Sequence, residues 1–472
     1  MKESDQVQRD MTQGKIAKQI FLFALPLMAG NFLQIFYNLV DGVVVSNFVN
    51  PTLPTAFSSV NVSTPLTMLF VAIAMGMSIG TGIMVSQYFG ARQYEDLRKT
   101  VSTSMIFLIA VSVALSLTGW FFCRSMLKGL LKLEDGAMLD GAVDYLSIYC
   151  LGLVFQFAYN VIASILRGIG NSRATLYFLL VSTLLNIVLD LVFVLVFGWG
   201  IAGTATATVI SQAASAFTAF AYMYKKYPLL RFKRSEFKLD AGKLKTAIRM
   251  SLPATVQQCI LSLSFISMQR LVISFGQETI DSFGAVTRVQ EFTLIPARSL
   301  HVGLLNFTGQ NVGAGQIGRV KRGHWLTVLM AICICIGISV LLYVLTGPLL
   351  HMFNLSGETF LRGHSQLRFV VWVLWILGLL FISYGVLQGS GDVVYPTVAS
   401  MTALILRVVF AYIAARYTSF GWRSVYIAHP ISTVLALFIT FGRYFSMKWV
   451  DKAIAKKKAD PQEDEAESVA AD

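Results

Sequence analysis

The sequence predicts an all-α membrane protein with twelve transmembrane helices in two pseudo-symmetric six-helix lobes. Two observations predict this fold. Of the 472 residues, 55% are apolar and 13% are charged, and the mean hydropathy is +0.65, whereas about 25% of the residues in a soluble domain are charged. In addition, several short motifs occur twice in the same order. Motifs repeated at one spacing indicate that half of the chain is a copy of the other half.

Four motif pairs carry this duplication, and their members lie about 220 to 227 residues apart. The pairs are 25–26 (LP) with 252–253 (LP), 87–91 (QYFGA) with 310–314 (QNVGA), 166–170 (LRGIG) with 387–391 (LQGSG), and 197–199 (FGW) with 420–422 (FGW). A duplicated bundle has an interface between its halves, where transporters commonly place the substrate site and the rocking motion.

Twelve apolar stretches are long enough to cross the hydrocarbon core of a bilayer, which is about 30 Å thick. They are too long for barrel strands, and open sheets cannot cross lipid, so we expect helices. The expected spans cover residues 17–48, 53–82, 97–122, 142–166, 174–197, 200–224, 246–275, 281–309, 325–348, 366–388, 394–416 and 421–447.

The chain therefore divides into five segments in order. We expect a cytoplasmic N-terminal segment over 1–16, a first six-helix lobe over 17–226, a basic cytoplasmic linker over 227–245, a second six-helix lobe over 246–447, and a cytoplasmic tail over 448–472. The end of the tail, from residue 459, is acidic and lacks apolar periodicity, which is typical of disorder. The first fourteen residues do not resemble a cleavable signal.

Charge predicts the orientation. If both termini are cytoplasmic, the inner loops and tails carry about 25 Lys and Arg and the outer loops about 7, as the positive-inside rule requires. The net charge of +13 then reflects the excess of Lys and Arg on the cytoplasmic side. We expect a multi-pass protein of the cell inner (cytoplasmic) membrane. We expect no nucleic acid partner, because no basic stripe with interleaved aromatic residues occurs.

Other chemistries lack their motifs. The five cysteines have neither metal-ligand spacing nor a paired framework, so we expect packing roles for them and no metal centre. Residues 168–170 and 389–391 do not follow strands, so their glycines indicate tight interhelical turns and not a nucleotide site. No phosphate-binding loop is present, so we expect no ATP hydrolysis by this chain and no cofactor. The protein is also expected to be a monomer and not an enzyme.

Polar residues in the first half indicate a coupling site. From the expected helix ends, Asp41, Asp190 and Thr208 all fall about 10 to 12 Å below the outer surface. Asn186 lies one turn before Asp190, and Asn61 falls at a similar depth. Ionisable groups inside spans are costly and usually functional. Two carboxylates, two amides and a hydroxyl could therefore surround a small cavity that takes up a proton or strips water from a cation such as Na⁺. The alternative is that these groups only pin helix packing.

The second half does not repeat the acidic pair. Asp41 corresponds to Met268, and Asp190 falls near 407–413. Arg288 and Glu291 have i, i+3 spacing, and Arg407 lies at a depth similar to Glu291, so we expect these charges to neutralise one another.

Three other polar residues of the second half fall within spans. Gln257 and Gln258, like Asn61 of the first half, are weak candidates for substrate contacts, with a structural role as the alternative for the two glutamines. His301 is expected to be a buried imidazole with its hydrogen bonds satisfied.

Two prolines lie inside long apolar spans. Pro26 and Pro253 remove an amide proton from the helical hydrogen-bond ladder and permit a bend. Each is a hinge candidate, and a static kink is the alternative.

Taken together, these motifs show that the chain resembles the multidrug and toxic compound extrusion (MATE) family over about residues 14–447. The resemblance rests on 25–26 (LP), 37–41 (YNLVD), 86–91 (SQYFGA), 166–170 (LRGIG), 186–190 (NIVLD), 198–203 (GWGIAG), 207–208 (AT) and 309–315 (GQNVGAG). It implies two six-helix lobes, a V-shaped cavity between them, and export of cationic or amphipathic organic compounds in exchange for H⁺ or Na⁺.

The resemblance also suggests a branch and roles for single residues. Other branches carry acidic residues in helices 7 and 10, whereas residues 252–264 and 371–381 contain no carboxylate here. The chain therefore looks like the DinF-type branch, in which first-lobe aspartates couple transport. Asp41 and Asp190 match those acids, and Asn186 and Thr208 match their polar companions.

The function expected from the sequence is a secondary antiporter that works by alternating access of its two lobes. A ligand shifts such an equilibrium only through different affinities for the two states, and a change in the charge of Asp41 and Asp190 would supply that difference. The alternative is a lipid-linked precursor flippase of related architecture, which would need cationic residues in a central cavity. A membrane enzyme is a more distant alternative, since no catalytic cluster is apparent.

Overall fold

The computed structural model describes residues 10–44, 49, 56–131, 135–231, 237–353 and 355–455. In these ranges the secondary structure is helical. The α-helices are α1 (Ile16–Val44), α2 (Ala56–Gly90), α3 (Tyr94–Leu131), α4 (Ala137–Gly168), α5 (Arg173–Leu191), α6 (Gly200–Lys226), α7 (Ala241–Ile273), α8 (Gln277–Gly313), α9 (Ile317–Met352), α10 (Gly357–Val371), α11 (Leu374–Gly389), α12 (Val394–Tyr417) and α13 (Ser424–Phe445). Four short helical segments are η2 (Val192–Val196), η3 (Pro228–Leu230), η4 (Gly421–Arg423) and η5 (Val450–Lys452).

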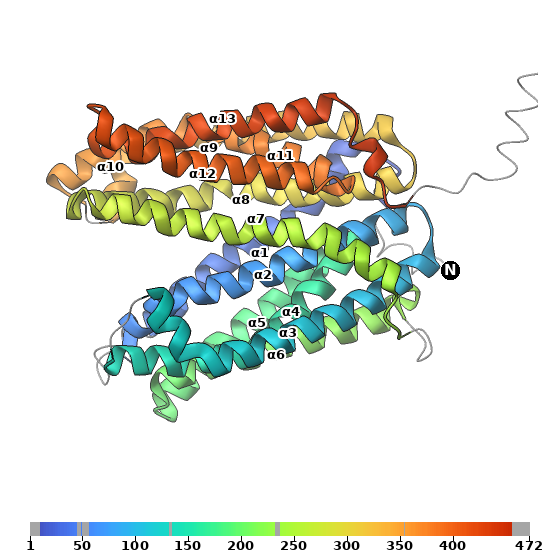
Figure 1. The fold of residues 1–472 in the computed structure, drawn as a ribbon, viewed down its shortest axis with the longest axis horizontal. Coiled ribbons are helices and arrows are strands. Elements are labelled where there is room, and N and C mark those ends of the chain that lie inside the picture. The colour runs from blue at the N-terminus through green and yellow to red at the C-terminus, as the bar shows by residue number, and fades with distance from the viewer. Residues whose placement is uncertain are drawn as a thin grey trace, which may run out of the picture.

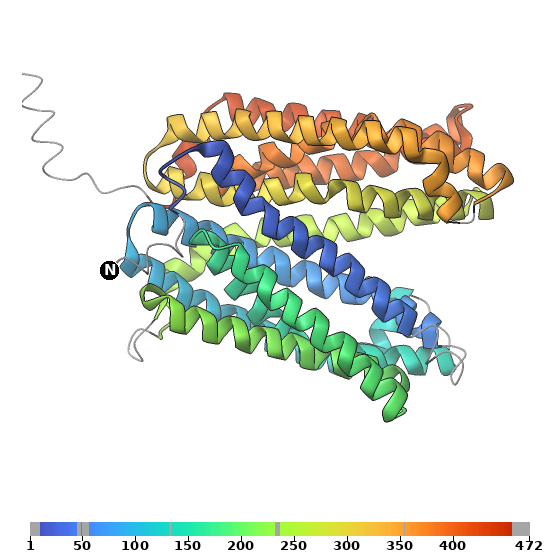
Figure 2. The ribbon, with the colours of Figure 1, turned by 180° about the vertical axis from the view of Figure 1, so that it is seen from behind.

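The helices form two bundles that lie side by side. Helices α1–α6, the first lobe, occupy the lower half of Figure 1, and α7–α13, the second lobe, the upper half. Figure 2 shows α1 running diagonally along the boundary, where it packs against α5 of its own lobe and α8 of the other. On the opposite face, α2 packs against α7 and α8. The arrangement agrees with the expected all-α, two-lobe fold.

The tenth expected span is broken in two. The sequence predicts one helix over 366–388, but α10 and α11 meet at an angle of 46°. At the break, Val373 N donates to Val370 O at 3.0 Å and Ile376 N to Val373 O at 3.1 Å. These tight i→i−3 bonds replace the regular i→i−4 ladder, and the sequence has neither Pro nor Gly there to announce the change.

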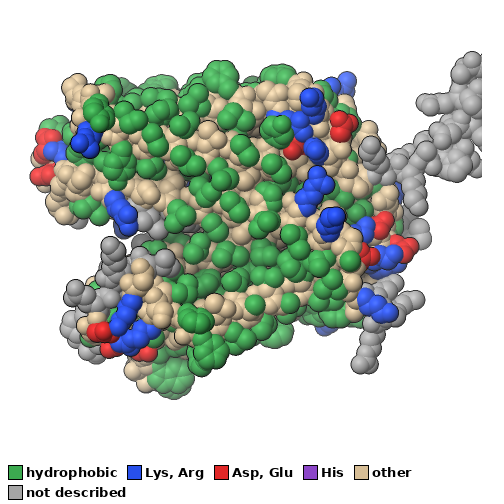
Figure 3. Space-filling model, in the orientation of Figure 1, with side chains coloured by type: hydrophobic (Ala, Val, Ile, Leu, Met, Phe, Trp, Pro, Cys, Tyr) green, Lys and Arg blue, Asp and Glu red, His purple; other side chains and the backbone are tan. Residues whose placement is uncertain are grey.

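Within the described residues, nine helices are long and apolar enough to span a membrane, or ten if α10 and α11 form one span. The two expected spans outside that set are α6 and α8, which carry more polar side chains and lie within the same bundles. Apolar side chains cover the flank of the molecule, and Lys, Arg, Asp and Glu gather at its two ends (Figure 3). This distribution fits a bundle whose flanks face lipid.

The ends of the bundle differ. We call the end that carries residues 87–93 and 310–316 the terminal end, because Met11 and Ile454 are also bound there. The opposite, distal end carries residues 135–136 and 274–277. The lobes converge at the terminal end and separate towards the distal end (Figures 1 and 3).

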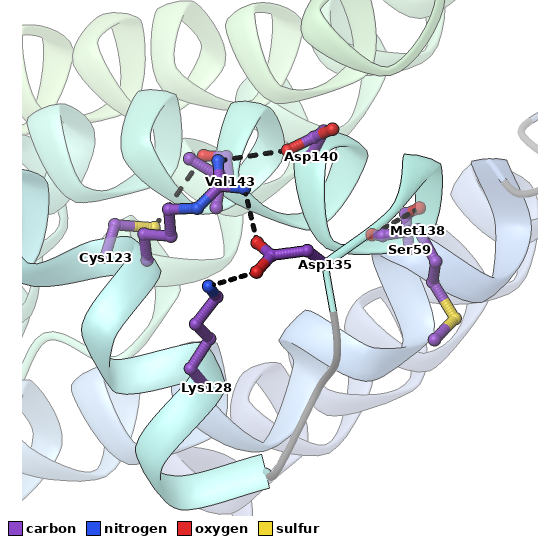
Figure 4. Close-up of polar contacts among 8 residues, drawn as sticks. Ser59, Cys123, Lys128, Asp135, Met138, Asp140 and Val143 are labelled. Atoms are coloured by element: carbon purple, nitrogen blue, oxygen red, sulfur yellow. Dashed lines mark hydrogen bonds and ion pairs between the residues drawn. The ribbon is translucent and has the colours of Figure 1, made fainter.

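At the distal end, exposed ion pairs join α3 to the start of α4 (Figure 4). The carboxylate of Asp135 forms ion pairs with Lys128, at an N–O distance of 2.6 Å, and with Arg124, at 2.8 Å. Arg124 also forms an ion pair with Asp140 at 3.0 Å. The hydrogen bonds from Lys128 and Arg124 lower the pKa of the Asp135 carboxyl. Exposed pairs of this kind contribute little to stability.

The lobes are joined at the terminal end by residues of the repeated motifs. Gly90 of α2 lies against the backbone of Gln310, and Gly313 of α8 lies against the backbone of Gln87. A Cβ atom at either glycine would clash with the facing carbonyl group, so no other residue allows this approach without a shift. Two copies of one motif therefore face each other across the lobe boundary.

Candidate functional site

Three polar side chains of the first lobe meet inside the bundle. Asp190 and Asn186 of α5 are 0% and 2% exposed, and Thr208 of α6 is 6% exposed. With its amide oriented to satisfy both neighbours, Asn186 donates from Nδ2 to Asp190 Oδ2 at 2.9 Å and accepts at Oδ1 from Thr208 N at 3.3 Å. The structure thus brings together three of the residues predicted from depth and spacing. We call them the α5–α6 cluster.

Local sequence explains why these groups point inward. Asn186 and Asp190 are one turn apart and share a face, while Leu184 and Val188, between and beside them, are both 57% exposed on the opposite face. On α6, Gly203 faces Phe193 of η2, the segment that continues α5, and Trp199, the residue before α6. Its lack of a side chain lets the two helices approach closely.

A cavity of about 90 Å³ lies beside the cluster. Its polar lining comes from four helices: Gln34 of α1, Gln156 of α4, Thr183 and Asn186 of α5, and Thr208 and Gln212 of α6. The space is large and polar enough for several water molecules. Two members of the α5–α6 cluster, Asn186 and Thr208, line this cavity, whereas Asp190 and Asn61 do not. The cluster therefore borders a hydrophilic chamber inside the first lobe, with part of the lining that the sequence predicts.

Sequence reasoning missed a change of helix type directly after the cluster. Helix α5 ends at Leu191 and continues as a π-helix, η2, in which Phe197 N donates to Val192 O at 3.1 Å. Single turns of π-helix occur frequently at functional sites. No residue pattern in this segment signals the wider turn.

Asp41 lies in the last turn of α1, and its side chain is outside the described residues. Helix α1 packs against α5. The role of Asp41 beside Asp190 stays a prediction.

Asn61 does not join the cluster. It is exposed on α2 and does not line the cavity. The α2 face that packs into the lobe carries instead Ser59 and Ser63, which bond to the backbone of α4. The sequence prediction used depth alone, and a similar depth does not place a residue on the same face.

In the second lobe, the weak substrate candidates belong to a different network. Gln388 of α11 accepts at Oε1 within 3.0 Å of His301 Nε2, and its Nε2 donates to Gln257 Oε1 at 3.4 Å. This network joins α8, α11 and α7. Its central residue, Gln388, directly precedes Gly389, whose carbonyl contacts the first lobe. Gln258, the next residue of α7, is half-buried.

The expected neutralisation of Glu291 by Arg288 and Arg407 is wrong. Glu291 pairs with Arg298 at 2.8 Å, two turns further along α8, and both side chains are about half exposed. Arg288 is exposed, and Arg407 lies on α12 without an ion pair to the described residues. Two turns of a helix also align residues on one face, a spacing that the sequence interpretation did not consider.

The hinge candidates remain untested. Pro26 and Pro253 lie inside α1 and α7, and both helices continue through them. The predicted interhelical turns do occur: Gly170 and Gly391 adopt φ of 91° and 94° directly after α4 and α11.

The comparisons with known proteins identify the family. A family model described as MatE matches residues 26–192 and 253–413. The chain belongs to the MatE family. The two matched segments of this MatE protein fall one in each lobe, as the duplication predicts.

Relatives of this MatE protein include "Probable multidrug resistance protein YoeA" of Bacillus subtilis (strain 168), which is 29% identical over 95% of this chain and 98% of its own length. "Multidrug export protein MepA" of Staphylococcus aureus (strain MSSA476) is 22% identical over 90% of this chain and 94% of its own. Both are named as transport or resistance proteins and not as enzymes.

Solved structures share the fold of this MatE protein. One, described as "Outward-facing conformation of a multidrug resistance MATE family transporter of the MOP superfamily", has a TM-score of 0.87 and 22% identity, and covers 94% of this chain and 98% of its own. Another, "Crystal structure of MATE in the bent conformation", has a TM-score of 0.87 and 22% identity over 96% of this chain and 99% of its own.

Proposed function

We propose that this MatE protein is a secondary antiporter that exports cationic or amphipathic organic compounds in exchange for H⁺ or Na⁺. The observation that carries the proposal is the α5–α6 cluster, where the fully buried carboxylate of Asp190 accepts a hydrogen bond from Asn186, and Asn186 lines a polar cavity. The names of the relatives, which refer to multidrug resistance and export, support an organic substrate. The DinF-type branch fits the absence of Asp and Glu from α7 and α11.

The coupling step is a change of charge at Asp190 and, by the sequence prediction, Asp41. A buried carboxylate is costly as an isolated charge, so it either takes up a proton or binds a cation. The oxygens of Asp190, Asn186 and Thr208 are hard ligands of the kind that Na⁺ prefers, and the same carboxylate can bind H⁺. Both ions are compatible with this group of side chains.

Binding of substrate and ion is expected to bias the two lobes between their states. The lobes are bonded at the terminal end and separate at the distal end (Figure 3), so the described state opens distally. With both termini in the cytoplasm, as the positive-inside rule requires, this is the outward-open state in an inner membrane. An ion that binds more tightly to the outward-open state, and a substrate that binds more tightly once the ion has left, would exchange across the membrane.

The flippase alternative is not favoured. A flippase for phosphate-bearing lipids needs several unpaired cations facing a central cavity. Arg298 is held by Glu291, and Arg270 and Arg288 are exposed. This leaves Arg407 as a single arginine with a buried Nε and without an ion pair to the described residues. The relatives named for multidrug export point the same way.

Everted membrane vesicles test the proposal. Efflux of a fluorescent organic cation is measured under a proton gradient and then under a sodium gradient, in wild type, Asp41→Asn and Asp190→Asn. We expect one of the two gradients to drive efflux by the wild type. In both variants the rate of this efflux should fall at least about tenfold, because each variant loses a group that can change its charge. Asp144→Asn, an exposed carboxylate on α4, is the matched control. Undiminished efflux by Asp190→Asn would refute the coupling site.

A further inference from the structure

The second lobe holds an arginine and a histidine, Arg407 and His429, at the place where the first lobe holds the α5–α6 cluster. Asn186 and Arg407 are 221 residues apart, as are Gly170 and Gly391 of the repeated motif. Each is the fourteenth residue of its helix, counting from Arg173 in α5 and Val394 in α12. The repeat therefore places a guanidinium where the first lobe has an amide.

The same offset relates α6, which packs against α5 in the first lobe, to α13, which packs against α12 in the second lobe. In the first lobe Asn171 donates to the hydroxyl of Tyr222 at 3.2 Å, and in the second lobe Arg443 donates to Asp392 at 2.5 Å. Asp392 and Arg443 each lie 221 residues after Asn171 and Tyr222. His429 of α13 lies 221 residues after Thr208. The positions of Asn186 and Thr208 in the first lobe are therefore occupied by Arg407 and His429 in the second lobe.

Arg407 points into the second lobe and not into lipid. Its neighbours two positions away, Ile405 and Val409, are 54% and 41% exposed, whereas Ala403 and Ala411, one turn away on its own face, are 9% and 0% exposed. A helix turns about 200° in two residues and about 40° in four, which puts Arg407 on the buried side.

His429 lies on the corresponding buried face of α13, with Val425 and Thr433 one turn away at 1% and 3% exposure. Helix α13 packs against α12 along its length. Cation and imidazole therefore share the interior of the second lobe.

No carboxylate compensates this charge within the described residues. The Nε of Arg407 is buried and makes no hydrogen bond there, and the guanidinium has no ion pair in that part of the chain. Helices α7, α11, α12 and α13, which pack around it, contain neither Asp nor Glu. Asp392, just before α12, is already held by Arg443. Buried cations inside a membrane protein require an anionic partner or a wet path to one.

We propose that Arg407 and His429 form a binding site for a carboxylate group of the transported molecule. A guanidinium binds a carboxylate through two parallel hydrogen bonds, and a neighbouring imidazole can donate a third. The first lobe would then bind the ion at a carboxylate, and the second lobe would bind the acidic group of an amphoteric substrate. This site extends the proposed function from cationic compounds to compounds that carry both charges.

A matched pair of dyes tests the site. Tetramethylrhodamine carries a carboxylate beside its cationic ring system, and its methyl ester carries the ring system alone. Binding of each to purified protein in phospholipid-free detergent is measured by fluorescence anisotropy. We expect Arg407→Gln to weaken binding of the acid about 10- to 100-fold and of the ester less than about twofold. Arg407→Lys keeps the charge and should retain part of the preference for the acid. Arg416→Gln, an exposed arginine on the same helix, should bind both dyes like wild type.

The outcomes separate the possibilities. If Arg407→Gln weakens binding of both dyes equally, and Arg407→Lys binds them no more tightly than Arg407→Gln does, then Arg407 has a structural role and the inference is overturned. Wild-type protein that binds the ester but not the acid overturns it while leaving the proposed function intact, and protein that binds neither dye counts against both. If phosphatidylglycerol, but not phosphatidylcholine, displaces the acid from wild type, a lipid headgroup occupies the site and the assignment to the transported molecule is wrong.

Discussion

Gln87 of the first lobe donates from Nε2 to the carbonyl of Gly389 in the second lobe at 2.9 Å. The repeat-related bond runs the other way, from Gln310 Nε2 of the second lobe to the carbonyl of Gly168 in the first at 2.8 Å. Both glutamines are 0% exposed. The two bonds are exchanged by the pseudo-symmetry of the molecule and close the terminal end. The acceptor side of each amide is also used, because Gln87 Oε1 accepts from Ile454 N at 2.7 Å and Gln310 Oε1 from Met11 N at 2.9 Å.

Removing these amides should open the terminal end. Each of Gln87→Ala and Gln310→Ala leaves buried backbone groups without a partner, which costs about 1 to 2 kcal/mol and shifts the balance of states about 5- to 30-fold. Spin labels at the exposed positions Val196 and Met352, in a cysteine-free background, would report the lobe separation at the distal end. We expect a shorter distance in both variants.

The control for this shift is Gln277→Ala, since Gln277 is exposed and bonds only within its own helix to Asp281 among the described residues. An unchanged distance distribution in the double variant Gln87→Ala/Gln310→Ala would show that the glutamines do not hold the lobes together.

The hydroxyl of Thr208 should matter for transport, and that of Thr218 should not. Both lie on α6 and bond back to a carbonyl one turn earlier, at 3.0 Å and 2.7 Å, but Thr208 is buried in the cluster and Thr218 is exposed. Thr208→Val removes a polar contact worth about 1 kcal/mol, so gradient-driven efflux should fall about fivefold. Equal efflux rates in Thr208→Val and Thr218→Val would argue against the hydroxyl as part of the site.

Filling the cavity should block transport without unfolding the protein. Ser211 is 1% exposed and lines the space beside Thr208. In Ser211→Leu the larger side chain takes up room needed by water or the ion, at a packing cost of about 1 to 3 kcal/mol. We expect at least a tenfold loss of efflux while the protein still elutes as a single species and unfolds cooperatively. Wild-type efflux in this variant would mean that the cavity is not on the ion path.

A repeat swap should restore stability at the terminal end of the second lobe. The Asp392–Arg443 pair is buried, with side chains 3% and 8% exposed, so Arg443→Tyr alone leaves a carboxylate uncompensated and should cost about 3 to 5 kcal/mol. Adding Asp392→Asn recreates the Asn171–Tyr222 contact of the first lobe. Thermal unfolding in detergent should show the double variant within about 1 kcal/mol of wild type. Additive destabilisation would contradict the equivalence of the two contacts.

The sequence predicted the fold class, the duplication and part of the site, for physical reasons that differ. Apolar length fixes the number and approximate place of spans. Counting residues from the helix ends gave Asp190 and Thr208 a similar depth, and the i, i+4 spacing of Asn186 and Asp190 gave those two a shared face, so the cluster could be predicted.

What the sequence could not supply is the rotation of one helix relative to another. Asn61 lies at the expected depth but on an exposed face, and Glu291 bonds to Arg298 instead of the nearer Arg288. The crossing of the repeated motifs, in which Gln87 reaches Gly389, likewise depends on how the lobes dock. The π-helix after Asp190 and the break between α10 and α11 lack a Pro or Gly at the point of change.

The most direct test of the coupling site is the release of the bound ion when substrate binds. Tetraphenylphosphonium, a cation without a titratable group, is added to purified protein in weakly buffered solution, and released protons or displaced sodium are measured. The account predicts release from wild type and at least a tenfold smaller release from Asp190→Asn at saturating ligand. Equal release from the two proteins would contradict a coupling role for Asp190.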